Sequence, residues 1–267
     1  MPNSHSFKWG VLYNADDLPM ADMLHYARMA EEAGADSVWA AEGWRDAFVP
    51  LTAMASVLQR VRVGTAIAQF ARPPVHTALS AMALAEYTNG RFVLGVGTAP
   101  PEWNKNWHGL EVQKPVARMR EYIDCLRTLW TATTAQPVSY TGEFVQVKDY
   151  LRFIPAAYER VPIYLAGVNR HMIRLAGSHA DGLILGPLNT PKYITEVVHP
   201  NILQRSSIPI SSSVGLRATS SCSSQGKQGV SMCWYPHAGS RHKMAEGPWQ
   251  RPGQRALVPG VPGRADQ

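Results

Sequence analysis

The chain has 267 residues, of which 45% are hydrophobic, and it carries a formal net charge of +6. This length allows one large α/β barrel or two small domains. No uncharged apolar run reaches about 18 residues, which argues against a membrane span, and the N-terminus lacks the basic and apolar segments of a secretion signal. Three cysteines without a CxxC pair provide neither a zinc site nor a disulfide framework. We therefore expect a cytoplasmic protein without a metal.

Apolar runs alternate with amphipathic segments along the first 200 residues. Runs rich in aromatic and β-branched residues predict buried strands, and apolar residues at helical spacing predict helices between them. In chain order, the expected elements are strand 7–13, helix 18–33, strand 37–41, helix 46–58, strand 61–70, helix 73–87, strand 91–96, helix 115–130, hairpin 139–149, strand 162–165, helix 170–178, strand 182–185 and helix 191–199. Residues 99–109 are expected to form a mobile loop, in which Pro100 and Pro101 restrict the backbone. Cys125 lies in the predicted helix 115–130 and is expected to be buried in the core.

Six strand–helix units with nearly continuous apolar strands imply a parallel sheet covered by helices. Two architectures fit this α/β pattern, namely a (β/α)8 TIM barrel and a doubly wound open sheet. The barrel needs two further units after residue 200. The strand-like runs beyond that point are interrupted by proline, and no window there shows helical periodicity.

The sequence changes character near residue 200. Residues 1–200 carry equal numbers of acidic and basic side chains, whereas residues 201–267 hold 8 Lys and Arg against only two acidic residues, together with 11 Ser, 8 Gly and 6 Pro. A sequence pI near 9.3 suggests nucleic acid at first sight, but this charge does not form a patch on a folded face. We expect an incomplete barrel over 1–200 and a disordered tail over 201–267. A reading-frame shift near residue 200 is our hypothesis for this change.

Candidate functional residues stand where the predicted strands end, which is where a barrel places its working side chains. Glu42 directly follows an apolar strand and could hold or move a proton, or else form a salt bridge to Arg45 or Arg72. Small residues at other strand ends let the backbone approach a ligand, although they also serve tight turns. Ala166 and Gly167 precede a helix and could seat a phosphate.

Aromatic residues and a histidine complete this set of candidates. Trp44, Trp103 and Trp107 could wall an apolar pocket or anchor loops. His108 follows the loop predicted over the mouth of the barrel, where it could act as an acid or base, and a surface histidine is the competing interpretation.

Several segments in the same order resemble the luciferase-like flavin-dependent oxidoreductases. The similarity is carried by residues 30–39 (AEEAGADSVW), 90–98 (GRFVLGVGT), 115–122 (PVARMREY), 161–168 (VPIYLAGV) and 180–186 (ADGLILG). Residues 65–77 (TAIAQFARPPVHT) are similar to the branch of that family that uses the deazaflavin coenzyme F420. Together these segments span about residues 7–200.

This resemblance implies a (β/α)8 barrel with its cofactor across the carboxyl ends of the strands. The cofactor would be F420, or FMN as the alternative, and a cis non-proline bond is often found at the end of the third strand. The resemblance places Glu42 at the acidic position of the family's second strand. Trp44 and His108 are the other catalytic candidates, because either of them, or Glu42 itself, could replace the histidine that many relatives have after that acid. The cofactor-binding positions that the resemblance implies are Ala68, Gln69, Gly97, Thr98, Ala166, Gly167, Val168 and Gly186.

The implied activity is hydride transfer between F420 and a small organic substrate. The sequence departs from the family in two places, because Gly43 stands where many relatives have a histidine and because residues beyond 200 lack the last two units. An FMN-dependent monooxygenase, a catalytically inactive remnant and a basic tail that binds nucleic acid or acidic lipids stay open as alternatives. Relatives suggest a homodimer by analogy, and neither nucleic acid nor a membrane is an expected partner of the folded part.

Overall fold

The computed structural model describes residues 9–13, 18–158, 160–186 and 189–202. The described residues end at Ile202, so the predictions for residues 203–267 lie outside them. Within the described part, seven strands form one sheet in which all pairings are parallel. They are β1 (Gly10–Tyr13), β2 (Ser37–Ala40), β3 (Arg62–Thr65), β4 (Ala68–Gln69), β5 (Phe92–Gly97), β8 (Ile163–Ala166) and β9 (Gly182–Ile184).

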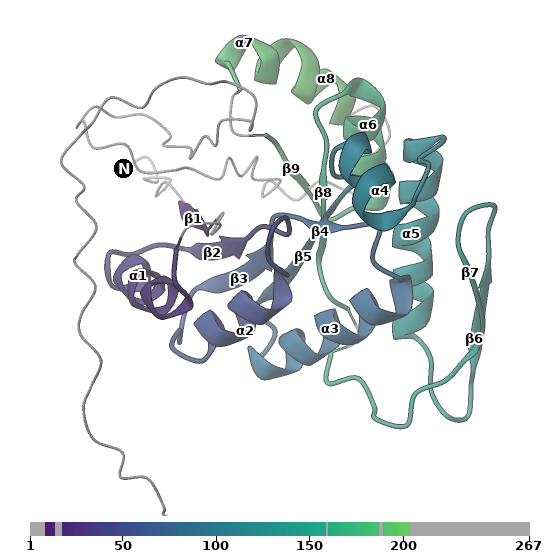
Figure 1. Ribbon diagram of the computed structural model, residues 1–267, viewed down its shortest axis with the longest axis horizontal. Coiled ribbons are helices and arrows are strands. Elements are labelled where there is room, and N and C mark those ends of the chain that lie inside the picture. Colours follow the sequence, from purple (N-terminus) through teal and green to yellow (C-terminus); the bar gives the residue numbers. More distant parts are fainter. Residues whose placement is uncertain (1–8, 14–17, 159, 187–188, 203–267) are drawn as a thin grey trace, which may run out of the picture. The chain divides into compact units, whose positions relative to one another are not determined.

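The order of the strands distinguishes the two architectures that the sequence allowed. Neighbours follow the path β1-β2-β3-β5-β8-β9, and β4 pairs with β5. A doubly wound sheet reverses its strand order at a switch point, whereas a barrel adds each new strand on the same side. The order here never reverses, so the described strands form part of a barrel, with β1 and β9 at the ends of the path (Figure 1).

The described helices are α1 (Met20–Glu32), α2 (Phe48–Ala55), α3 (Pro74–Tyr87), α4 (Pro101–His108), α5 (Pro115–Trp130), α6 (Arg170–His179), α7 (Pro191–Tyr193), the π-helical segment Ile194–Val198 and α8 (His199–Ile202). The helices α1, α2, α3 and α6 form a layer against the parallel sheet, and α5 packs on α3 and α6 in that layer (Figure 1). The main core lies between this layer and the sheet, and it includes Cys125, which is buried as expected. No helix in the described ranges is long and apolar enough to cross a membrane.

The strands bury both of their faces because successive side chains point in opposite directions. Val38 belongs to the main core, whereas its neighbour Trp39 packs with Val93 and Ile184 in a smaller cluster on the other face. Gly64 makes room for the Trp39 ring, since a Cβ on this residue would overlap the ring. Side chains therefore fill the inner side of the described sheet, as in a barrel interior.

The expected strand 61–70 is two strands. β3 ends at Thr65, the Ala66–Ile67 peptide bond is cis, and β4 begins at Ala68. β3 pairs with β5 at Val63 and Gly64, and β4 pairs further along the same strand. The cis non-proline bond implied by the family resemblance is therefore present, and it directly precedes Ala68 and Gln69, the two residues of this strand that were expected to contact a cofactor.

The prediction of a mobile loop over residues 99–109 was wrong for most of this segment, because residues 101–108 form the helix α4. Pro101 occupies the first helical turn, where a missing N–H costs nothing, and Gly109 ends the helix with φ 64°. Pro100 and Pro101 were interpreted as loop stiffeners, whereas they begin a helix.

The predicted hairpin forms as a separate antiparallel pair, β6 (Val138–Thr141) and β7 (Gln146–Tyr150). The Glu121 carboxylate of α5 accepts hydrogen bonds from the N–H groups of Glu143, Phe144 and Val145. This attaches the hairpin turn to the outer helix.

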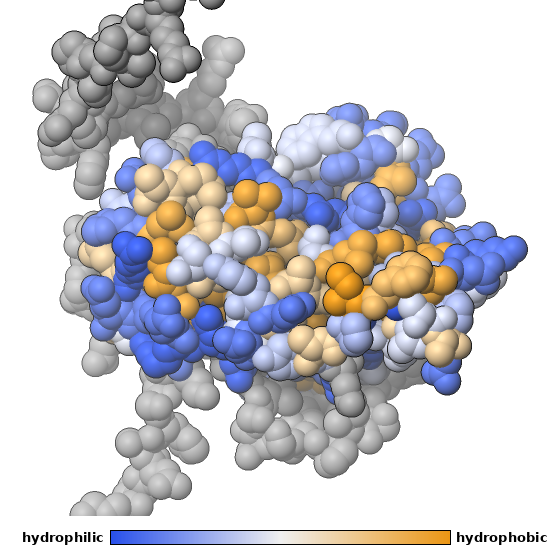
Figure 2. Space-filling model, turned by 90° about the horizontal axis from the view of Figure 1, so that it is seen from below, coloured by the Kyte–Doolittle hydropathy of each residue, from blue (hydrophilic) through white to orange (hydrophobic). Residues whose placement is uncertain are grey.

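The surface shown in Figure 2 carries apolar patches among polar residues. Exposed large apolar side chains of the described part include Val49 on α2, Leu79 and Tyr87 on α3, and Phe153 and Ile154 after the hairpin.

Candidate functional site

The carboxylate of Glu42 lies at the carboxyl end of the sheet, two residues after β2. It accepts a hydrogen bond from the backbone N–H of Gln69 over 2.6 Å. In return, the Gln69 side-chain Nε2 donates to the Glu42 carbonyl over 3.1 Å. These two reciprocal bonds join the end of β2 to the end of β4. Each side chain is thereby held by backbone atoms of a strand end, which fixes its position well.

Arg72 connects this carboxylate to a second one. Its Nη1 lies 2.9 Å from Glu42 Oε1 and 2.6 Å from Asp46 Oδ2. Its guanidinium also lies 4.8 Å above the ring of Phe48. The competing interpretation of Glu42 as a salt-bridge partner of Arg72 is therefore correct, whereas Arg45 instead donates to the carbonyl of Leu18 over 2.7 Å.

Burial raises the pKa of Glu42 above the ordinary value for a glutamate. The Gln69 N–H and the Arg72 guanidinium lower it in part, and the nearby Asp46 carboxylate adds to the increase. The pKa of Arg72 is also raised, because its two carboxylate partners outweigh its own burial. The arrangement therefore favours a charged arginine beside a carboxyl group that binds a proton more readily than an exposed glutamate does.

A cavity of about 240 Å³ opens beside this network. Its lining residues are Glu42, Gly43, Trp44, Arg45, Asp46, Gln69, Ala71, Arg72, Trp107 and His108. All three predicted catalytic residues, Glu42, Trp44 and His108, therefore contribute to one cavity, together with Gln69. Asp46 is a lining residue that the sequence interpretation missed.

Three tryptophans form a wall beside the cavity, and two of them, Trp44 and Trp107, line it. Trp103 and Trp107, one helical turn apart on α4, stack with centroids 4.4 Å apart. Trp44 meets them edge-on, at 5.0 Å from Trp103 and 6.0 Å from Trp107. Trp44 is 60% exposed and Trp107 is 48% exposed. Because aromatic faces are left accessible beside a cavity, this wall suits contact with an apolar or flat molecule.

His108 lies at the last residue of α4, and its Nε2 is 3.3 Å from Gln69 Oε1. The Gln69 amide is oriented by the Glu42 carbonyl, which only accepts hydrogen bonds, so the amide NH2 must point there and Oε1 must face His108. His108 Nε2 is therefore the donor in this contact. The exposed ring keeps Nδ1 as the nitrogen that can accept a proton.

The other predicted cofactor positions lie at adjacent strand ends and do not line this cavity. Gln69 pairs with Gly97, and a Cβ on Gly97 would lie 3.2 Å from the Ala166 Cβ, so the ends of β4, β5 and β8 come together. Ala68 is 1% exposed in the main core, so only its backbone could meet a ligand. The Thr98 carbonyl accepts a hydrogen bond from Asn104 Nδ2.

The proposed phosphate seat before α6 is partly engaged by the protein itself. The Gly167 N–H donates to the Ile184 carbonyl over 3.1 Å, and the Asn169 side chain accepts from the Met172 N–H as the N-cap of α6. Val168 is 63% exposed next to Gly186. The Val168 carbonyl accepts a hydrogen bond from the Tyr193 hydroxyl over 2.6 Å, so the backbone of this turn is partly engaged there as well.

Small residues stand at three neighbouring strand ends. Gly97, Ala166 and Gly186 bear no side chain larger than a methyl group. The Ile67 side chain already occupies the space in front of Gly97, because a Cβ there would come within 2.6 Å of Ile67 Cδ1, whereas a Cβ on Gly186 would meet only Val168, at 3.6 Å. Among the described residues, a flat cofactor ring of the flavin type would therefore find room at Ala166 and Gly186, with the backbone of Gln69 and the Glu42 cavity beside it.

Comparisons with known proteins agree with this architecture. The profile of the luciferase-like monooxygenase family matches residues 5–205. A Mycobacterium tuberculosis protein, provisionally named a coenzyme F420-dependent oxidoreductase, is 43% identical over 115 residues, covering 42% of this chain and 33% of the relative. The F420-dependent glucose-6-phosphate dehydrogenase of Amycolatopsis mediterranei is 29% identical over 194 residues, covering 66% of this chain and 56% of the relative. The chain thus spans one third to just over half of these relatives.

Solved structures share the fold. An F420-dependent secondary alcohol dehydrogenase in complex with an F420–acetone adduct superposes with a TM-score of 0.65 at 22% identity, covering 73% of this chain and 62% of the other. A monooxygenase from Streptomyces bottropensis gives a TM-score of 0.66 at 19% identity, covering 80% of this chain and 69% of the other. The family profile covers most of the chain and coincides with the described barrel units, so this chain belongs to the luciferase-like monooxygenase family.

Proposed function

We propose that this chain provides the cofactor face of an oxidoreductase that transfers a hydride between coenzyme F420 and a small organic substrate. The observation that carries the proposal is the Glu42–Gln69–His108 arrangement, which lines a cavity directly beside the small residues at the ends of β4, β5 and β8. The names of two relatives, from Mycobacterium tuberculosis and Amycolatopsis mediterranei, favour F420 over FMN.

When bound, the deazaflavin supplies a ring carbon that accepts or gives a hydride, and the protein orients and shields it. Ala166 and Gly186 would leave room for the ring. The tryptophan wall, formed by Trp44, Trp103 and Trp107, would exclude water from the substrate side.

The proton that accompanies hydride transfer needs a group with a free acceptor. His108 Nδ1 is our candidate to take or give it, because the contact with Gln69 occupies Nε2. Glu42 would orient Gln69 and hold the charge of Arg72, and burial raises its pKa above that of an exposed glutamate.

An FMN-dependent monooxygenase is the second candidate, because the family profile is named for monooxygenases and a monooxygenase is among the solved structures of the same fold. Reduced FMN reacts with oxygen, whereas the reduced deazaflavin hardly does. Oxygen consumption in the presence of each reduced cofactor therefore separates the two candidates.

A fluorescence titration of the purified chain with F420 and, separately, with FMN tests the proposal. Micromolar binding of F420 with much weaker binding of FMN is the expected result. Tighter binding of FMN together with oxygen uptake would favour the second candidate. Binding of neither by folded protein would mean that the chain is an inactive remnant of the family.

A further inference from the structure

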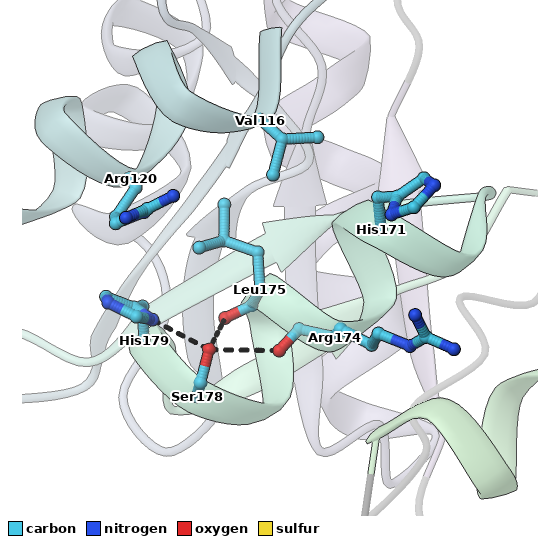
Figure 3. Close-up of a pocket in the computed structure, with 7 residues that line it drawn as sticks. All are labelled: Val116, Arg120, His171, Arg174, Leu175, Ser178 and His179. Carbon is cyan, nitrogen blue, oxygen red and sulfur yellow. Dashed lines mark hydrogen bonds between the residues drawn. The ribbon is translucent and has the colours of Figure 1, made fainter. Parts of the chain in front are cut away.

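A second and larger cavity lies between α5 and α6. It has a volume of about 510 Å³ and is open to solvent on one side. The residues that line it are Val116, Arg120, His171, Arg174, Leu175, Ser178 and His179 (Figure 3). None of them lines the Glu42 cavity, so the function proposed above does not account for this groove.

The groove is lined by basic groups and contains no acidic side chain. Arg120 comes from α5, whereas Arg174 and both histidines come from α6. Within the described ranges, the ion pairs of arginine involve Arg72, Arg127 and Arg160, and none involves Arg120 or Arg174. Two guanidinium groups therefore line one cavity without an ion pair to any carboxylate of the described residues.

Arg174 is positioned before any ligand arrives. Its Nε donates to Asn201 Oδ1 over 2.8 Å, and the Asn201 Nδ2 is itself held by the Val197 carbonyl at 2.7 Å. This leaves the two terminal nitrogens of the guanidinium for a ligand. A guanidinium fixed through one nitrogen loses less conformational entropy on binding an oxyanion than a free arginine does.

Hydrogen bonds also orient the far end of the groove. The Ser178 hydroxyl lies 3.0 Å from the Arg174 carbonyl, 3.2 Å from the Leu175 carbonyl and 2.7 Å from His179 Nδ1 (Figure 3). The Ser178 side chain, which lines the same cavity, therefore orients the His179 ring.

The basic groups stand at two ends of the groove. Figure 3 shows Arg120 and His179 at one end and His171 and Arg174 at the other, with Leu175 pointing toward Val116 between them. Two cationic ends separated by an apolar middle suit an elongated molecule with negative charge at both ends, since a single small anion would contact only one end.

We propose that the groove between α5 and α6 binds a small, multiply charged oxyanion whose phosphate or carboxylate groups contact Arg120 at one end and Arg174 at the other. Such a ligand gains charge-assisted hydrogen bonds from arginine forks, which are stronger than neutral ones. The groove is thus a binding site separate from the strand-end cavity.

The test is calorimetric titration of the full chain with tripolyphosphate and, in a second arm, with citrate. Arg120→Glu reverses the charge at one end of the groove, and His171→Glu adds a negative charge at the other end. Both side chains are exposed, so neither replacement should disturb the packing. Arg28→Glu is the matched control, because Arg28 is an exposed arginine on α1 and its replacement changes the net charge by the same amount as Arg120→Glu does.

We expect micromolar binding of at least one anion, weakened tenfold or more by Arg120→Glu and by His171→Glu and less than twofold by Arg28→Glu. The tighter of the two anions identifies phosphate or carboxylate as the preferred group. Absence of binding by the unmodified chain would overturn the proposal. An equal loss in Arg28→Glu, or unchanged binding in Arg120→Glu, would also overturn it, because either result would assign the anion to other cations of the chain.

Discussion

The Gln69 N–H donates a 2.6 Å hydrogen bond to the Glu42 carboxylate, and the Gln69 side chain returns a bond to the Glu42 carbonyl. Two strand ends that are 27 residues apart in the chain are thereby locked together at the mouth of the sheet. The same glutamine faces His108 on α4, so one buried residue links the carboxylate, the strand end and the histidine of the candidate site through its backbone N–H and its side chain.

Replacement of Glu42 by glutamine is expected to change how stability depends on pH. The folded pKa of Glu42 is raised by burial, so its favourable contribution is fully present below the ordinary glutamate pKa and is lost as pH rises through the folded value. The free energy of unfolding of the unmodified chain, relative to Glu42→Gln, should therefore fall from about pH 4 toward neutrality. Urea denaturation of both proteins across that pH range measures this difference in unfolding free energy. A difference that grows as pH rises would contradict a raised pKa of Glu42.

Glu31 provides the opposite case. Burial alone would raise its pKa, but the N–H groups of Val61, Arg60 and Gln59 and the charge of Arg60 together lower it. Its contribution is present above the ordinary glutamate pKa and is lost as pH falls through the folded value. Glu31→Gln should therefore cost stability at neutral pH and progressively less in acid. The same urea titrations check this, and a cost that is independent of pH would refute it.

Gly64→Ala is expected to destabilise the barrel interior. A Cβ at this position would overlap the Trp39 ring and come within 2.9 Å of the Val93 carbonyl, so the buried cluster would have to shift. Overpacking of this kind costs about 1–3 kcal/mol. Gly43→Ala is the control, since its Cβ would meet Trp103 at an ordinary 3.6 Å. Equal unfolding midpoints for the two variants would show that Trp39 is not confined as described.

The hydrogen bond from His108 to Gln69 predicts the tautomer of the ring. Imidazole ¹⁵N chemical shifts should show the neutral ring protonated mainly at Nε2, because Gln69 Oε1 accepts from that nitrogen. Gln69→Leu removes this acceptor and should shift the populations of the two tautomers, whereas Gln146→Leu on the exposed hairpin should not. Unchanged shifts in Gln69→Leu would show that the contact does not control the ring.

Much of the fold was predictable because local signals agreed with the final packing. Helix 115–130 begins at a proline and keeps its apolar residues on one face, and its bounds were predicted as observed. The run 61–70 was misinterpreted as one strand because small and apolar residues continue across Ala66 and Ile67. The break at Ala66–Ile67 depends on pairing with β5, which lies far along the chain and leaves no local signal.

The candidate site was predictable to the extent that it follows strand ends. Glu42 and Gln69 were identified because each follows or ends an apolar strand. Asp46 was missed because its role depends on Arg72, 26 residues away, and this ion pair has no spacing that a sequence pattern can show. α4 was missed because Pro100 and Pro101 were interpreted as features of a loop, although proline at a helix start is also common.

The most direct test of the central claim asks whether the small residues at the strand ends hold the cofactor. Ala166→Phe would fill the mouth beside Gly97, and Ala83→Phe makes the same change on an exposed position of α3. In a fluorescence titration with F420, we predict that Ala166→Phe weakens binding at least tenfold while Ala83→Phe leaves it within twofold. Equal binding by both folded variants would contradict the placement of F420 at these strand ends.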